Sequence, residues 1–323
     1  MNSFGRLFRV SIYGESHGQE IGILIDGCPP GLNLTNNDFE TDLLRRKSGA
    51  KGTTTRLESD TPFIKSGVFN DKTTGAPLLI AFENKNINSR DYDYLKNTPR
   101  PGHADFTAAK KYDGFNDYRG GGHFSGRLTL GLVAAGVIAK KIIEPIKVTA
   151  ILVEAGGDTN IDRAVNNALE AKDSIGGIIQ CEVLNVPIGL GEPFFDSVES
   201  LLSHMMFAIP AVKGIEFGDG FGAARMKGSE CNDQIINANG KTDTNHAGGI
   251  NGGITNGNPL LFRVAVKPTP SISLPQRTVN LQTGEPVDLE IQGRHDTCIA
   301  LRVPVVVECA SAIVLADLMM QNK

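Results

Sequence analysis

The sequence lacks several features that would by themselves define a chemistry. Its five cysteines form no C-x-x-C pair, so paired-cysteine zinc sites are excluded and the thiols are expected to be reduced: Cys28, Cys181, Cys231, Cys298 and Cys309. An excess of positive charge is also missing, because the net charge is −4 and the pI is near 5.9. Proteins that bind nucleic acid usually carry a basic face, so nucleic acid is not expected as a partner.

Long apolar segments are absent as well. The most hydrophobic stretches, residues 128–143 and 303–320, are too short or too interrupted by charge to span a bilayer. We therefore expect both to form buried core, and we expect no membrane partner. Near the N-terminus, Arg9 interrupts the one apolar candidate for a signal peptide. A cytoplasmic location is predicted.

Among the features that are present, residues 14–18, GESHG, match the G-x-S-x-G nucleophile elbow of α/β-hydrolases. That elbow requires a helix after its serine. Here residues 7–13 and 21–26 are rich in β-branched and aromatic residues, which predicts a strand-to-strand loop around Ser16 and His17. The order of the triad also fails, since His295 precedes Asp296 and no histidine follows. A serine hydrolase is therefore the disfavoured alternative.

The periodicity of apolar residues predicts both helices and strands. Strands are expected at residues 63–69, 78–83, 148–154, 178–183 and 260–266, and helices at 35–47, 126–143, 161–171, 197–207 and 310–321. The helix at 126–143 is apolar on nearly every face, so it should lie buried between layers. The prediction is a single α+β domain over residues 1–323, a sandwich with buried central helices rather than a doubly wound sheet.

Glycine-rich loops carry most of the histidines and many arginines. The histidines are His17, His103, His123, His246 and His295, and the arginines are Arg45, Arg46, Arg100, Arg119, Arg127, Arg294 and Arg302. Guanidinium groups pair bidentately with carboxylate and phosphate, and imidazole exchanges protons at cellular pH. This pattern indicates an enzyme pocket for a small molecule with several anionic groups.

Two other interpretations of these loops can be weighed from the sequence. No metal site is predicted, because H-E-x-x-H, paired-cysteine and EF-hand spacings are all missing. An anion-binding or RNA-binding module is the remaining alternative. It would be favoured by aromatic residues that stack on bases, yet aromatic residues make up only 6% of the chain.

Six segments in register carry a resemblance to a known family: GESHG, RPGHAD, YRGGGxxSxR, HAGGIxGG, KPTxSI and GRHDxC. Over residues 4–318 the chain resembles chorismate synthase. The resemblance implies a β-α-β sandwich, a homotetramer and a flavin-dependent lyase of aromatic amino acid biosynthesis. The implied reaction is the anti-1,4-elimination of phosphate from 5-enolpyruvylshikimate 3-phosphate to give chorismate, on reduced FMN without net redox change. An external flavin reductase or NADPH would supply the reductant.

The resemblance also implies roles for individual residues. His17 would protonate the departing phosphate, His103 would protonate or orient the flavin, and Asp296 would help to remove the ring hydrogen, with Ser16 and Ser125 as hydrogen-bonding relays. The substrate's anionic groups would be bound by Arg45, Arg46, Arg100, Arg119 and Arg127. The flavin would be held by His123, Phe124, Ser125, Ala211, Gly252, Lys267, Pro268, Thr269, Pro270, Ser271 and Arg294, with Lys267 at its phosphate.

Three positions depart from the family's usual pattern. The glycine triplet is commonly followed by arginine and here by His123, and the S-x-R arginine is usually followed by glutamate and here by Leu128. A further arginine usually stands where this chain has Gly52. Unless Lys51 compensates, weaker affinity for substrate or flavin is expected.

Overall fold

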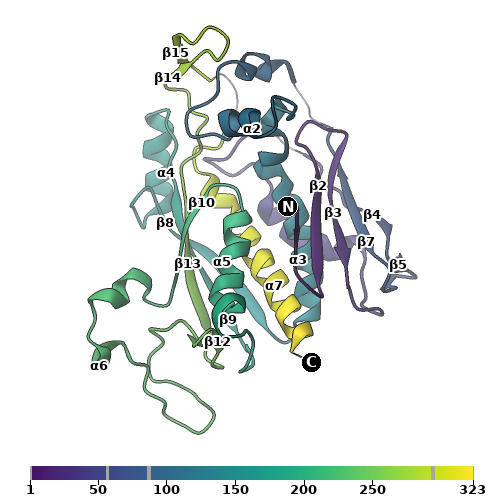
Figure 1. The fold of residues 1–323 in the computed structure, drawn as a ribbon, viewed down its shortest axis with the longest axis vertical. Coiled ribbons are helices and arrows are strands. Elements are labelled where there is room, and N and C mark those ends of the chain that lie inside the picture. Colours follow the sequence, from purple (N-terminus) through teal and green to yellow (C-terminus); the bar gives the residue numbers. More distant parts are fainter. Residues whose placement is uncertain (1, 56–57, 86–88, 292–294, 323) are drawn as a thin grey trace.

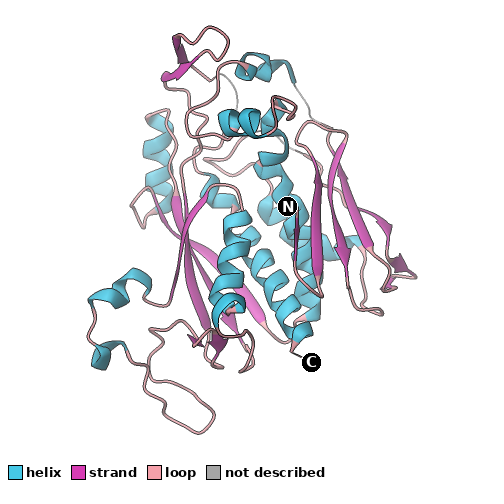
Figure 2. Cartoon of the chain, in the orientation of Figure 1, coloured by secondary structure: helices cyan, strands magenta, loops and turns pink. Residues whose placement is uncertain are grey.

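The computed structural model describes residues 2–55, 58–85, 89–291 and 295–322. Two antiparallel sheets lie on opposite sides of a layer of helices, as Figures 1 and 2 show. This arrangement confirms the predicted α+β sandwich with helices at its centre.

The first sheet has the strand order β1-β2-β3-β7-β4. Its strands are β1 (Ser3–Phe4), β2 (Arg9–Gly14), β3 (Glu20–Asp26), β7 (Leu78–Glu83) and β4 (Phe63–Ser66). Ile21, Ile23 and Ile25 of β3 are buried at alternate positions, as expected for a strand with one face on the core. The hairpin of β2 and β3 carries Ser16 and His17 in its loop. A strand therefore follows Ser16, which excludes the nucleophile elbow.

The second sheet has the order β10-β13-β9-β8. Its strands are β10 (Val212–Phe217), β13 (Leu260–Val266), β9 (Gly177–Leu184) and β8 (Lys147–Ala155). Every second residue of β13 is buried, from Leu260 to Val266. Three of these strands were predicted. The fourth, β10, was missed because Lys213, Gly214 and Glu216 dilute its apolar pattern.

Two helices fill the space between the sheets. These are α3 (Thr129–Ile142) and α7 (Pro304–Gln321), which pack on each other, with α3 against β3 and α7 against β8 and β9. A side chain at Gly136 would collide with Cys309, so this glycine allows their close approach. Contrary to the expectation for residues 303–320, the helix α7 is long and apolar enough to cross a membrane. The expected burial is confirmed, since 78% of the helix is buried inside the protein, as is usual for a core helix.

Shorter elements surround this core. The remaining α-helices are α1 (Glu40–Arg46), α2 (Asp105–Lys111), α4 (Ile161–Glu170), α5 (Val198–Ala208) and α6 (Gly228–Cys231). The two-stranded hairpins are β5 (Val68–Phe69) with β6 (Lys72–Thr73), β11 (Ile250–Asn251) with β12 (Ile254–Thr255), and β14 (Gln276–Val279) with β15 (Pro286–Leu289). The 3-10 helices are η1 (Asn36–Phe39), η2 (Ser89–Lys96), η3 (Arg119–Phe124), η4 (Gly126–Leu128), η5 (Phe194–Asp196), η6 (Gly220–Arg225) and η7 (Ile299–Arg302). The strand expected at 63–69 is divided at Gly67 into β4 and β5.

Candidate active site

A cavity of about 730 Å³ collects most of the predicted site residues. Its walls come from the β2–β3 loop and from parts of residues 100–104, 120–129, 208–211, 267–271 and 295–306. Both central helices begin at this cavity, with Thr129 of α3 and Val303, just before α7, in its wall. Because helix N-termini carry unpaired N–H groups and a positive dipole end, they favour an anion there.

Two arginines of this wall share one carboxylate. Nη1 of Arg127 donates to Oδ1 of Asp60 at 2.8 Å, and Nη1 of Arg46 lies 3.6 Å from Oδ2 of the same residue. The side chains of Arg46 and Asp60 are each 3% exposed. Burial lowers the pKa of Arg46 to about 9, although Asp60 acts in the opposite direction. The arginines expected to bind anions are thus held in a fixed arrangement.

Asp296 occupies a neighbouring part of the wall. Its Oδ1 accepts a hydrogen bond from the backbone N–H of Thr54 at 3.0 Å, and both carboxylate oxygens lie 3.4 Å from Nη1 of Arg302. Nε of Arg302 in turn donates to the carbonyl oxygen of Arg46 at 2.9 Å. The carboxylate predicted to take part in proton removal therefore adjoins the arginine cluster.

His103 belongs to a second network, with Arg100 and Asp105. Nδ1 of His103 lies 2.5 Å from Oδ1 of Asp105, and Nε and Nη2 of Arg100 donate to the same carboxylate at 2.8 Å. Burial by itself raises the pKa of Asp105, but the hydrogen bonds from Arg100 and His103 outweigh it and hold the pKa well below its ordinary range. Nη1 of Arg100 also donates to Ser271 at 3.1 Å. Asp105 thus holds Arg100 and His103, the two basic residues of the RPGHAD segment, in place.

Ser16 lines the cavity, whereas His17 is packed beside it. His17 is 4% exposed, and its ring meets Tyr92 edge-on at a centroid distance of 5.1 Å. A Cβ atom at Gly120 would lie 2.4 Å from Cδ2 of His17. Gly120 and Tyr92 both line the cavity. His17 therefore lies directly behind these two residues of the cavity wall.

The sequence of the chain that forms this site matches a known family of enzymes. A family model described as chorismate synthase matches residues 8–320. The chain belongs to the chorismate synthase family. It is therefore a lyase of aromatic biosynthesis, as the sequence segments predicted.

Individual relatives agree with this assignment. A chorismate synthase of Chitinophaga pinensis is 64% identical, with 99% of this chain and 97% of the relative covered. A chorismate synthase of Thermococcus kodakarensis is 45% identical, with 99% and 98% covered. A crystal structure of chorismate synthase superposes with a TM-score of 0.76 at 26% identity, and the match covers 99% of this chain and 93% of that chain.

The segments that the chorismate synthase resemblance assigned to flavin adjoin the same cavity. Phe124, Ser125, Ala211, Lys267, Thr269, Pro270 and Ser271 line it, and Pro268 lies between lining residues. Oγ1 of Thr269 is buried without a hydrogen-bond partner, which suits an acceptor on a bound molecule. Lys267 donates to the carbonyl oxygen of Gly102. Arg294 lies outside the described residues.

Besides Pro268, three of the predicted binding residues that the structure describes do not line this cavity. Arg45 instead donates to Glu308 at 2.6 and 2.7 Å and to Asp42 at 3.2 Å. Arg119 is paired with Asp117 at 2.8 Å. Gly252 lies in the short hairpin of β11 and β12. In a single chain these three residues lie outside the cavity wall, and their contact with a ligand stays a prediction.

Each residue at the three departures from the chorismate synthase pattern has defined neighbours in the structure. Nδ1 of His123 lies 2.8 Å from the carbonyl oxygen of Gly14, and its Nε2 lies 3.1 Å from Oδ1 of Asn2. Leu128 is buried in the hydrophobic core. Gly52 has φ +85°, and a Cβ atom there would lie 2.5 Å from Cγ1 of Val165. An arginine at position 52 would therefore have a strained backbone, and its Cβ would collide with Val165.

Several cavity residues were not assigned a role from the sequence. They are Thr54, Glu58, Tyr92, His295, Ile299, Arg302, Val303 and Val306. Arg302 and His295 belong to the loop arginines and histidines from which the sequence predicts a pocket for an anionic molecule, but neither received an individual role. Asp60 gave no signal, because the segment before β4 has no apolar period.

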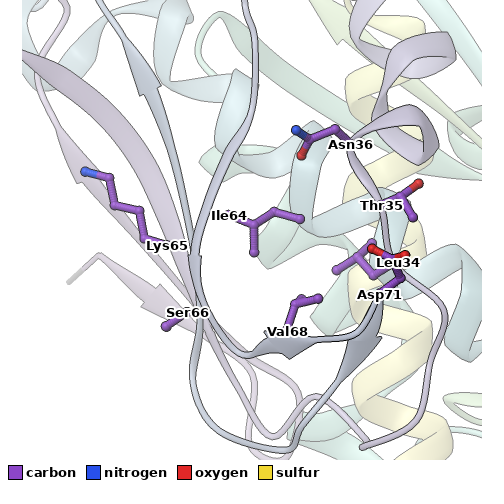
Figure 3. A pocket seen from close by; sticks show the side chains of 8 residues that line it. All are labelled: Leu34, Thr35, Asn36, Ile64, Lys65, Ser66, Val68 and Asp71. Atoms are coloured by element: carbon purple, nitrogen blue, oxygen red, sulfur yellow. The ribbon is translucent and has the colours of Figure 1, made fainter.

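A smaller cavity of about 300 Å³ lies near the outer edge of the first sheet (Figure 3). Leu34, Ile64 and Val68 contribute apolar groups to it, and Asp71 contributes a carboxylate. The ammonium of Lys65 points away from these residues and pairs with Glu20 at 2.5 Å (Figure 3). None of the predicted site residues is among the residues that line it. The larger cavity is therefore the candidate active site.

Proposed function

We propose that this chain catalyses the anti-1,4-elimination of phosphate from 5-enolpyruvylshikimate 3-phosphate to give chorismate, with reduced FMN and without net redox change. The observation that carries the proposal is the convergence of Arg46, Arg127 and Arg302 with two helix N-termini at one cavity. The substrate has two carboxylates and a phosphate, and such groups pair with guanidinium forks. One cavity therefore contains several cationic side chains that can bind a substrate with three anionic groups.

The residues of the cavity also fit a flavin. Segment 267–271 would hold its phosphate through Lys267 and the buried hydroxyl of Thr269, and the turn at Ala211 would present backbone to the ring system. When bound, reduced FMN would supply electron density to the breaking allylic C–O bond. The chain's own task is to position substrate and flavin and to exclude water from the cavity.

Different titratable groups of the chain are proposed to carry out the individual proton transfers. His17, placed behind Gly120, is proposed to give a proton to the departing phosphate, since a phosphate leaves more easily when its charge is reduced. Asp296, held by Thr54 and Arg302, is proposed to take part in removing the ring proton. His103 is proposed to protonate or orient the flavin, with Ser16 and Ser125 as hydrogen-bonding relays.

An anaerobic assay tests this function. The purified protein is mixed with dithionite-reduced FMN and 5-enolpyruvylshikimate 3-phosphate, and chorismate is followed by its absorbance. We expect chorismate and phosphate in equal amounts, and only while the flavin stays reduced. If neither product forms with authentic reduced flavin present, the proposed function is wrong.

Three further parts of the proposal concern the oligomeric state, the reductant and the cellular location of the enzyme. Self-association as a homotetramer is supported by aromatic side chains that a single chain leaves exposed, such as Phe115, Phe194 and Phe195. Sedimentation equilibrium would give the mass. The reductant is proposed to be an external flavin reductase or NADPH, and the location to be the cytoplasm.

A further inference from the structure

We propose that Asp60 is a positioning residue, which sets the spacing and orientation of Arg46 and Arg127 so that both guanidinium groups can bind the substrate's anionic groups. This inference rests on the proposed function, in which these two arginines bind the substrate. Asp60 itself is not among the residues lining the cavity, so its effect passes through its partners.

The geometry around Asp60 is that of a bridge. Its two carboxylate oxygens face different arginines, with Oδ1 at 2.8 Å from Arg127 and Oδ2 at 3.6 Å from Arg46. The side chain of Arg46 also contacts the backbone of Arg127, since its Nη2 donates to the carbonyl oxygen of Arg127 at 3.1 Å. Nε of Arg127 is fixed by Oδ1 of Asn84 at 2.7 Å. One carboxylate therefore joins α1 to the turn before α3.

The charges around Arg46 make this bridge necessary. Two cations, Arg302 and Arg127, oppose its positive charge, and two carboxylates, Asp60 and Asp296, favour it, with Asp60 the stronger of the two. Nε of Arg46 is buried without a hydrogen-bond partner, so the guanidinium is not held by other polar groups on that side. Without Asp60, Asp296 would be the carboxylate left among these four groups to offset the charges of Arg302 and Arg127 on Arg46.

The backbone at Asp60 is held in an uncommon conformation. Its φ of 50° lies in the left-handed region, which non-glycine residues adopt at some cost, although aspartate tolerates it better than most. Such conformations persist where surrounding contacts determine them, and they are common at functional sites. Among the contacts of the described residues, the two buried ion pairs of Asp60 can do so.

Positioning by Asp60 and its negative charge alone predict opposite effects on substrate binding when Asp60 is neutralised. Asp60 carries a negative charge beside a site proposed to bind a polyanion, so its removal should tighten substrate binding if it acts only through its field. If Asp60 positions the arginines, the same change should weaken binding. Because the arginines bind the ground state and the transition state alike, a loss of their alignment should appear mainly in KM.

Steady-state kinetics of Asp60→Asn distinguish the two cases. We expect KM for 5-enolpyruvylshikimate 3-phosphate to rise about 10- to 100-fold, with kcat reduced less than about threefold. The rise of KM at alkaline pH should also begin at a lower pH than in the wild type, because the pKa of Arg46 falls further when Asp60 is neutral. The matched control is Asp38→Asn, which removes a carboxylate from a partly exposed pair with Lys141 and should leave KM unchanged. An unchanged or lower KM in a folded Asp60→Asn protein overturns the role.

Two further measurements keep the result decisive. If the wild type does not turn over the substrate, the proposed function fails, and binding of inorganic phosphate by calorimetry still tests Asp60: weaker binding in Asp60→Asn supports it, and equal binding overturns it. If Asp60→Asn does not fold, Asp60→Glu is used, which keeps the charge and moves it by one methylene. A rise in KM of about threefold or more supports positioning, and a wild-type KM in that variant contradicts it.

Discussion

Arg45 donates two hydrogen bonds to Glu308, at 2.6 and 2.7 Å, and this pair joins α1 to α7. Glu308 also accepts from Lys140 of α3 at 3.3 Å and from the backbone N–H of Ala150 in β8 at 2.9 Å. The adjacent residue, Arg46, lies in the cavity wall instead. Two neighbouring arginines of one helix therefore serve different purposes, the partly exposed Arg45 in the pair with Glu308 and Arg46 in the site.

The variants Arg45→Gln and Arg46→Gln should separate these purposes. Arg45→Gln should lower the free energy of unfolding by about 1 kcal/mol, because the arginine is partly exposed and Glu308 keeps its other partners. Its KM should stay within about twofold of wild type. Arg46→Gln should raise KM about tenfold or more. Its loss of stability should be small, because Asp60 keeps Arg127 as a partner and burial disfavours the charge of Arg46. Denaturant unfolding and kinetics check both, and an equal rise in KM for the two variants would contradict the division.

The sequence could predict the layers of this fold but not the partners within the site. The apolar helix at 126–143 and the alternating strands carry their own periodicity, so their burial follows from local pattern. Arg45 and Arg46 have the same chemistry, and successive helical residues point about 100° apart, so only the packing against α7 decides which one faces the cavity. Asp60 lies in a segment without periodicity, and its contacts with Arg127 and Arg46 become visible only after folding.

Insertion of the missing family arginine, Gly52→Arg, should destabilise the protein rather than improve substrate affinity. The positive φ strains any other residue, and the new Cβ would collide with Val165 and approach Leu301 at 3.3 Å. We expect a loss of about 1–3 kcal/mol in the free energy of unfolding and no decrease in KM. Gly52→Ala is the control, since it should show most of the same loss. A stable Gly52→Arg protein with a lower KM would show that the loop rearranges to accept the arginine.

Acid titration should reveal the role of Asp105. Its pKa in the folded state lies below the ordinary value of 3.8, so its stabilising effect is complete above about pH 4 and is lost as the pH falls further, towards the folded-state pKa. Asp105→Asn should lower the free energy of unfolding at pH 7 by about 3 kcal/mol, because Arg100 and His103 lose a buried partner. The difference between wild type and variant should shrink below pH 4. A difference that stays constant from pH 6 to pH 3 would contradict the depressed pKa.

Gly120→Ala should disable His17 without unfolding the protein. The added Cβ would lie 2.4 Å from Cδ2 and 2.5 Å from Nε2 of His17 and 2.9 Å from Oγ of Ser16, so both groups must move. Displacement of a catalytic group by about 1 Å can cost 100-fold in rate, and we expect kcat for chorismate formation to fall by about that factor. The matched control is Gly157→Ala, which also has a positive φ but no atom within 4 Å of the new Cβ. Its strain should be similar, and its kcat should remain that of wild type. If both variants lose activity equally, backbone strain explains the effect, whereas loss in Gly120→Ala alone supports a role of the Ser16 and His17 pair in the reaction.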